Sequence, residues 1–209
     1  MKSLALICGF SLLAAGALSA QETPKFSFDI GGGFTQPVGS TGMQLNDGWN
    51  VQGGAGYNFS PHLGAMLQVN YNAMGINSST LNTLGFPGGD VHVLSATVEP
   101  IIHLHPKGRI DPYIVGGGGL YHIYDEFTQP TVATITGFSP FFGFFPAQVA
   151  ATQVLSSYSI NKPGFNVGAG ISIGTKYKGK FFAEARWDHI FMSNYGHMDY
   201  VPVSFGFRW

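Results

Sequence analysis

The sequence is almost without cysteine, which limits what can hold the folded chain together. Its 209 residues include a single cysteine, Cys8, and this residue lies in an apolar run near the start of the chain. Disulfides and thiolate metal sites need cysteines in pairs or clusters, so neither is available. Cys8 is also too close to Met1 to be a lipidated terminus. We therefore expect no metal and no cofactor, and a fold that depends on backbone pairing.

Charged side chains are scarce as well. They make up 10% of the residues, against roughly 25% in an ordinary soluble domain. Lys and Arg number 10 and Asp and Glu number 11, so the chain has no basic surplus. A protein that binds nucleic acid needs such a surplus to neutralise phosphates, so nucleic-acid binding is excluded.

Long apolar runs are also missing beyond residue 20, because Gly, Asn and Ser interrupt every apolar stretch. A membrane-spanning helix needs about 20 consecutive apolar residues, so a helical membrane protein is excluded. Glycine and aromatic residues are abundant instead, with 30 glycines and 14% aromatics. This composition suits β-structure with bare interior positions and aromatic belts better than it suits helices.

The first residues have the layout of a cleaved secretory signal. A basic residue comes first, an apolar run follows, and small residues end at Ala20 before a polar stretch. We place the cleavage after Ala20. Because Leu18 is large for its position, cleavage after Ala17 or Ser19 is the alternative. The sequence thus predicts an exported protein with a signal peptide over residues 1–20.

The rest of the chain, residues 21–209, alternates apolar and polar residues with period two in several separate segments, which is typical of β-strands exposed to different surroundings on their two faces. The last strand places Val203, Phe205 and Phe207 on one face and Ser204 on the other. The predicted strands are 25–34, 49–59, 63–73, 91–104, 110–124, 164–174, 181–191 and 200–209.

The segments joining these strands alternate between long and short. Residues 74–90 and 125–163 are the longer ones and contain the turn-forming residues of loops. An even number of antiparallel strands joined in this way predicts an all-β fold, an eight-stranded up-and-down transmembrane β-barrel with long external loops and tight periplasmic turns. In the strand 110–124 the four glycines Gly116–Gly119 leave open which face meets lipid.

A soluble ligand-carrying barrel would alternate in the same way, so charge has to separate the two possibilities. A stripe facing water should carry many Lys and Glu residues. Here the polar stripe consists of Gly, Ser, Asn and Gln, with a few charges that can pair, such as Asp29, Glu99 and Arg208. This indicates that the apolar face meets lipid and the polar face lines a narrow lumen.

Four segments, 111–121, 164–174, 182–187 and 203–209, together resemble the small eight-stranded outer-membrane barrels. That group includes the OmpA barrel domain, OmpX, the opacity proteins and OmpW. The resemblance implies a location in the outer membrane, where lipid surrounds the barrel. It also implies that the terminal aromatic residues act as the signal that the barrel-assembly machinery binds during biogenesis. These residues are Phe205, Phe207 and Trp209. A soluble domain like the one that follows the OmpA barrel is not expected.

The sequence predicts a charge cluster inside the lumen. Glu184, Arg186 and Asp188 occur at every second position of one strand, so their side chains should all point inward. Arg among carboxylates in a confined space forms charge-assisted hydrogen bonds. The cluster is either structural, pinning strands together, or an ion gate. We favour the structural role, because side chains can fill an eight-stranded lumen.

The long segment 125–163 contains an apolar cluster where exposed loops are usually polar. Its phenylalanines are Phe138, Phe141, Phe142, Phe144 and Phe145. Exposed apolar patches generally mark contact sites. This segment is therefore a candidate to bind a surface partner, to dip into the lipid leaflet or to cover the barrel mouth, and the alternative is that it packs on its own rim.

A second candidate site consists of imidazole and carboxylate side chains expected toward the outer rim, which would suit a zinc site or the base of a lipid hydrolase with Ser193 as nucleophile. The residues are Asp90, His92, His122, Asp125, Asp188, His189, His197 and Asp199. They come from separate hairpins without ligand-type spacing, so we favour solvated rim side chains.

Three functions follow, in decreasing order of support. The first is a non-enzymatic outer-membrane barrel with a structural or surface-contact role, such as adhesion, carried by its external loops. The second is a narrow channel for small or hydrophobic solutes, as in OmpW-like proteins. The third is a lipid-modifying enzyme of the outer membrane.

Overall fold

The chain folds into one closed antiparallel barrel in which each strand pairs with the next and β8 returns to β1. The structure, a computed structural model, describes residues 25–175, 179–193 and 196–209. The predicted all-β, eight-stranded fold is confirmed. The predicted signal peptide lies outside the described residues. The strands are β1 (Phe26–Pro37), β2 (Leu45–Asn58), β3 (Leu63–Ile76), β4 (Gly88–His103), β5 (Ile110–Ser139), β6 (Gly143–Gly174), β7 (Lys180–Phe191) and β8 (His197–Arg208).

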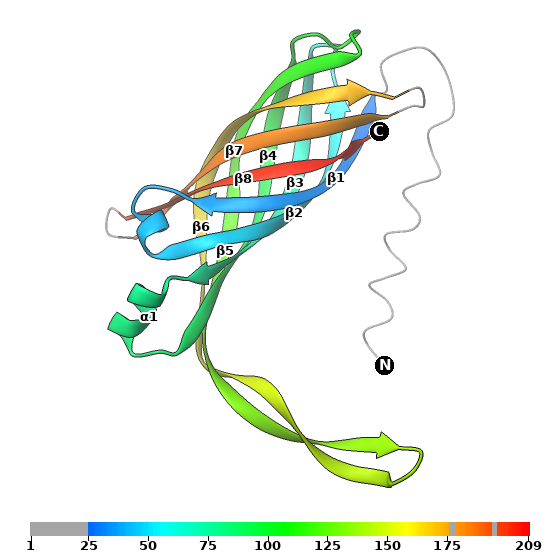
Figure 1. Cartoon of the computed structure of the whole chain (residues 1–209). Helices are drawn as coiled ribbons and strands as arrows, with labels where there is room; N and C mark the ends of the chain where they lie inside the picture. Colours follow the sequence, from blue (N-terminus) through cyan, green and yellow to red (C-terminus); the bar gives the residue numbers. More distant parts are fainter. Residues whose placement is uncertain (1–24, 176–178, 194–195) are drawn as a thin grey trace.

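The barrel closes where the first and last strands meet. β1 and β8 pair in antiparallel register from Asp29 opposite Arg208 to Pro37 opposite Tyr200. Phe28 and Trp209 continue this ladder by exchanging two backbone N–H···O=C hydrogen bonds of 2.9 Å. β1 begins and β8 ends at the same end of the barrel, which we call the termini end; Figure 1 shows the opposite end, where β5 and β6 project.

The two faces of the strands differ as the alternation predicts. Large apolar side chains such as Ile30, Leu67 and Val98 are exposed on the outside, whereas Gln68 and Thr97 are buried inside. The structure also shows which side chains of β5 point outward. On this strand Ile114 and Leu120 face outward, and the inward side chains are Asp111, Tyr113, Val115, Tyr121 and Ile123.

Aromatic rings form a belt around the outside at each end of the apolar band. At the termini end, Tyr57 contacts Phe26 and Phe59 with ring centroids 5.4 Å apart in both pairs. At the other end, Trp49 on the same strand lies 5.4 Å from Tyr71. The ten residue steps from Trp49 to Phe59 cover roughly 34 Å, or about 26 Å when tilted as barrel strands are. The band therefore has the height of a hydrocarbon layer.

The longest connection differs from its prediction. Residues 125–163 were expected to form a loop, but β5 and β6 continue through this segment as a paired hairpin. They are in register as far as Ser139 opposite Gly143, with one register shift between Phe127 and Thr128. Pairing satisfies the backbone groups of a projecting segment, and its Thr, Val and Ile residues favour strands. Figure 1 shows this two-stranded ribbon leaving the barrel and curving to one side.

The segment 74–90, also predicted as a loop, contains a short helix between the ends of β3 and β4. This helix, α1 (Ser78–Leu84), begins after Asn77, whose side chain accepts a hydrogen bond from the Ser79 N–H at 3.0 Å. It ends at Gly85, which has a left-handed φ of 77°. Both are standard helix caps. A 3₁₀ turn, η1 (Thr41–Met43), lies between β1 and β2. In the described part of the chain, no helix is long and apolar enough to cross a membrane.

Glycine is required where neighbouring strands approach each other closely. A Cβ added to Gly119 on β5 would lie 2.0 Å from the Ala96 carbonyl oxygen of β4. Gly53 on β2 has room, because the nearest atom to an added Cβ is 3.6 Å away.

We expect Gly119→Ala to lower the free energy of unfolding by about 1–3 kcal/mol, because the strands must move apart to admit the methyl group. Gly53→Ala should leave it nearly unchanged. Urea unfolding of the refolded protein in detergent, followed by tryptophan fluorescence, measures both. Equal effects from the two substitutions would show that close strand approach is not the cause.

Candidate functional site

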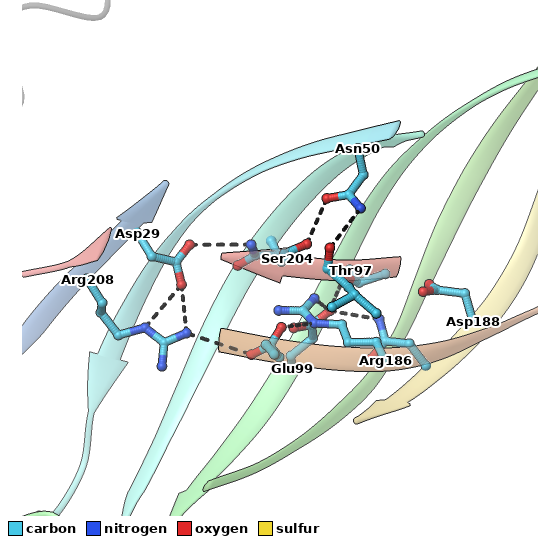
Figure 2. A network of polar contacts seen from close by, with 12 residues as sticks. Asp29, Asn50, Thr97, Glu99, Arg186, Asp188, Ser204 and Arg208 are labelled. Carbon is cyan, nitrogen blue, oxygen red and sulfur yellow. Dashed lines mark hydrogen bonds and ion pairs between the residues drawn. The ribbon is translucent and has the colours of Figure 1, made fainter. Parts of the chain in front are cut away.

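Charged side chains from non-adjacent strands meet inside the barrel. Arg186 on β7 donates from Nη1 to Glu99 Oε1 on β4 at 2.8 Å and from Nε to Glu184 on its own strand. All three side chains are buried. Because β4 and β7 are not neighbours, the Arg186–Glu99 ion pair crosses the lumen (Figure 2). The predicted inward placement of Glu184 and Arg186 is what the structure shows.

A second arginine continues this network toward the termini end. Arg208 on β8 lies 2.8 Å from Asp29 on β1, and Figure 2 shows the two side chains facing each other. The same guanidinium is 4.0 Å from Glu184 and has its central carbon 4.9 Å from the Tyr113 ring centroid. Both arginines are thus surrounded by carboxylates, as buried charges require. We call Asp29, Glu99, Glu184, Arg186 and Arg208 the lumen network.

Neutral side chains supply further hydrogen bonds to Glu99. Its Oε1 accepts from Thr97 at 2.6 Å and from Asn166 at 2.7 Å. Asp188, the third member of the predicted charge cluster, is buried nearby but accepts a hydrogen bond from the Tyr121 hydroxyl at 2.8 Å. The structure therefore divides the predicted cluster: Glu184 and Arg186 pair with each other, and Asp188 bonds to a tyrosine.

A cluster of apolar side chains lies in the lumen beyond this network, toward the end from which the hairpin projects. Leu81 of α1 is buried there in one apolar cluster with inward side chains of β3, β4, β5, β7 and β8, so the helix packs on that end of the interior. The buried residues of this apolar plug are Met74, Ile76, Leu81, Val91, Val93, Tyr121, Ile123, Ile190, Met198 and Tyr200. The interior is thus lined by buried side chains of both kinds, with polar side chains around the lumen network and apolar side chains gathered in the plug.

The predicted rim site is dispersed. His92 bonds Tyr71 at 2.8 Å and His122 bonds Asn161 at 2.8 Å, while Asp188 points into the lumen. Asp90 and Asp125 lie in the β4–β5 ladder, opposite Glu126 and Val91. These residues do not form one site, because alternate strand positions point to opposite faces.

Three members of the predicted rim site do lie together. Asp199 bonds His189 Nδ1 at 2.6 Å and is 3.4 Å from His197 Nε2. The Ser193 hydroxyl, the suggested nucleophile, instead accepts a hydrogen bond from Lys162. Across the described residues, no group of three or more His, Cys, Asp or Glu side chains is arranged to hold a metal ion.

The tip of the β5–β6 hairpin exposes the predicted phenylalanines. Phe141 and Phe142 are 90% and 85% exposed, and Phe144 and Phe138 are 77% and 65% exposed. Phe138 and Phe144 face each other across the hairpin with ring centroids 5.2 Å apart. Phe145, at 41%, is less exposed. We call these five residues the phenylalanine tip.

The terminal aromatic residues lie on the outer face. Phe205 and Trp209 are exposed, and Phe207 packs between Phe181 and Trp209 at centroid distances of 5.2 and 6.1 Å. They belong to the aromatic belt at the termini end, and their part in assembly stays a prediction.

Sequence reasoning missed several lumen residues. Thr97 and Asn166 are single polar residues in alternating strands, and nothing local marks them as partners of Glu99. Tyr121 lies in the strand for which the sequence did not show which face points inward, so its hydrogen bond to Asp188 could not be predicted. The apolar plug has a weak signal in the sequence: inward positions near the far ends of several strands are Val, Ile or Met instead of Gly, Ser or Asn.

A closed barrel with an apolar outer band between two aromatic belts and a partly polar interior is an integral membrane β-barrel. The model of the family "Outer membrane protein beta-barrel domain" matches residues 5–208. The chain belongs to this family and is an outer-membrane barrel. Since such barrels have short periplasmic turns and longer external loops, we infer that the termini end is periplasmic and the hairpin external.

Solved structures show the same fold. The Neisserial surface protein A is 14% identical, with 88% of this chain and 96% of that chain covered and a TM-score of 0.58. A major outer membrane protein from Thermus thermophilus is 10% identical, with 88% and 97% covered and a TM-score of 0.53. No curated protein matches the chain. At sequence identities this low, the similarity shows only that the fold is shared.

We expect Arg186→Met to lower the free energy of unfolding by about 3–5 kcal/mol, because it leaves Glu99 buried without a cation and leaves Glu184 with only the more distant Arg208. Lys162→Met, which removes an exposed cation, should change it by less than about 0.5 kcal/mol. Guanidinium unfolding of the refolded protein in detergent compares the two. A small effect at Arg186 would contradict the ion pairs described for the lumen network.

Proposed function

We propose that this protein is a non-enzymatic outer-membrane scaffold that works through contacts made by its external β5–β6 hairpin. The observation that carries the proposal is the phenylalanine tip, held away from the barrel with Phe141 and Phe142 almost fully exposed. Large apolar side chains exposed together generally serve a contact, since water disfavours them otherwise.

The interior supports a scaffold more than a path for solutes. A solute moving along the lumen would meet the Arg186–Glu99 ion pair across the barrel and then the apolar plug under α1. Passage would require breaking buried ion pairs and separating packed apolar side chains, and both changes are costly. The runner-up, a narrow channel for small or hydrophobic solutes, has less support for this reason.

Planar-bilayer recordings separate these two functions. We expect the wild-type protein to give no stepwise ion current in salt solution, because the lumen network and the apolar plug both lie across the path. A shortened chain in which Asn-Gly replaces residues 130–152 should also give none. Gln129 and Gln153 are cross-strand partners, so a two-residue turn can close the hairpin between them. Reproducible single-channel steps from the wild type would favour the channel.

The shortened chain also tests where the role resides. Cells that make it, at an amount matched by immunoblot, are compared with wild-type cells for adherence to surfaces and for outer-membrane integrity against detergent. We expect the shortened chain to behave like cells without the protein, because the barrel remains but the contact element is gone. Lys162→Met, at the root of the hairpin, is the control and should match the wild type. Wild-type behaviour of the shortened chain would refute the proposal.

The enzymatic alternative rests on the His189–Asp199 pair and on Ser193, whose hydroxyl bonds Lys162. We expect His189→Ala and Ser193→Ala to leave the phospholipid and lipid A profiles of the cells unchanged, because the geometry does not join this base to this nucleophile. Thin-layer chromatography and mass spectrometry of extracted lipids measure this. A new or missing lipid species in either variant would favour an enzyme.

A further inference from the structure

The hairpin beyond the barrel carries no charge. From Phe127 to Asn161 the sequence contains no Asp, Glu, Lys, Arg or His. The nearest charged side chains are Glu126 and Lys162, which lie one on each strand at the root of the hairpin. Moving charged groups into lipid is costly, and this segment avoids that cost entirely.

The backbone of the tip is arranged so that the two outermost rings point away from the chain. Gly143 takes a left-handed φ of 73°, and the Ser139 hydroxyl accepts a hydrogen bond from the Phe141 N–H at 3.2 Å. These features close the turn between β5 and β6. Phe141 and Phe142 thus form a convex apolar end, and a protein partner would need a deep pocket to cover it, whereas a lipid layer adapts to a convex shape.

The edges of the hairpin are poor templates for another strand. Pro130 lies opposite Thr152 and Pro146 lies opposite Thr136, so both prolines occupy the same set of alternate cross-strand positions. A proline within a paired strand must direct its nitrogen away from the partner, and it therefore removes a hydrogen-bond donor from the open edge. One proline on each strand disfavours both strand addition and pairing with a second copy of the chain.

The hairpin is long enough for its tip to reach lipid beside the barrel. Tyr124 stacks on His92, and His92 stacks on Tyr71 of the aromatic belt at the hairpin end, with ring centroids 6.0 and 5.8 Å apart. Tyr124 therefore marks the membrane surface on β5. The 17 residue steps from Tyr124 to Phe141 correspond to roughly 55 Å of strand. Figure 1 shows that the ribbon does not continue straight out but bends, so that its last part runs sideways past the end of the barrel.

We propose that the phenylalanine tip docks into the outer leaflet of the same membrane that the barrel spans, with Phe141 and Phe142 inserted among the lipids. This inference rests on the proposed function, since it names the surface that the hairpin contacts. The barrel and the docked tip then hold the membrane at two separate points. Because no charge takes part, docking is independent of anionic lipid and of salt.

Depth-dependent quenching tests this docking. The full chain with Cys8→Ala carries a fluorophore either at Pro140→Cys in the tip or at Thr134→Cys in the part of the hairpin nearer the barrel, which we call the shaft. It is reconstituted into phosphatidylcholine vesicles with nitroxide-labelled acyl chains. We expect the nitroxides to quench the tip fluorophore and aqueous iodide to quench the shaft fluorophore. Adding Phe141→Ser and Phe142→Ser should reduce nitroxide quenching of the tip to the level of the shaft, whereas Val132→Ser, an exposed apolar change in the shaft, should not.

Several outcomes would overturn the inference. Iodide quenching of the tip equal to that of the shaft would show that the tip remains in water. Nitroxide quenching that arises only after labelled vesicles are added to protein in unlabelled vesicles would assign the tip to an apposed membrane. Quenching that needs anionic lipid, or disappears in high salt, would exclude charge-free docking.

The proposed function and this inference fail separately. A tip quenched by lipid, together with wild-type behaviour of cells that make the shortened chain, would refute the proposed function and leave the docking. Loss of the cellular role in the shortened chain, together with a tip exposed to iodide, would refute the docking and leave the proposed function.

Discussion

Backbone pairing around a closed ring is the constraint on which the rest of this structure depends. In hydrocarbon every backbone N–H and C=O group needs an internal partner, and only closure of β8 onto β1 provides one for both edges. The ladder from Asp29 and Arg208 to Pro37 and Tyr200 does this over the height of the band. Close strand approach at positions such as Gly119 follows from the same pairing. A chain without disulfides thereby spans a membrane.

Closure makes an interior that is too narrow to leave its few charges apart. Arg186 and Arg208 pair with carboxylates on other strands. The Arg186–Glu99 ion pair joins β7 directly to β4, which backbone pairing connects only through the strands between them. The same ion pairs that join these strands also lie across the lumen. The apolar plug under Leu81 of α1 adds a second barrier of a different kind.

The hairpin extends this pairing beyond the membrane. Outside the barrel, β5 and β6 have only each other as partners, and their outer edges are interrupted by Pro130 and Pro146. Such a hairpin is better suited to bind through its tip than through the edges of its strands. The interior contains paired charges, whereas the hairpin contains none. This contrast fits the proposed function, in which the barrel gives a fixed position in the membrane and the hairpin makes contacts.

The sequence by itself determined the strand count, the outward and inward faces of most strands and the inward placement of Glu184 and Arg186, because period-two alternation is local. Only the tertiary structure decided which side chains meet. Glu99 reaches Arg186 across the barrel, Asp188 bonds to Tyr121, and His92 and His122 bond to separate partners, because these contacts depend on register and curvature. The phase of β5 and the pairing of residues 125–163 were likewise decided by neighbouring strands, since glycines and small polar residues carry no periodic signal of their own.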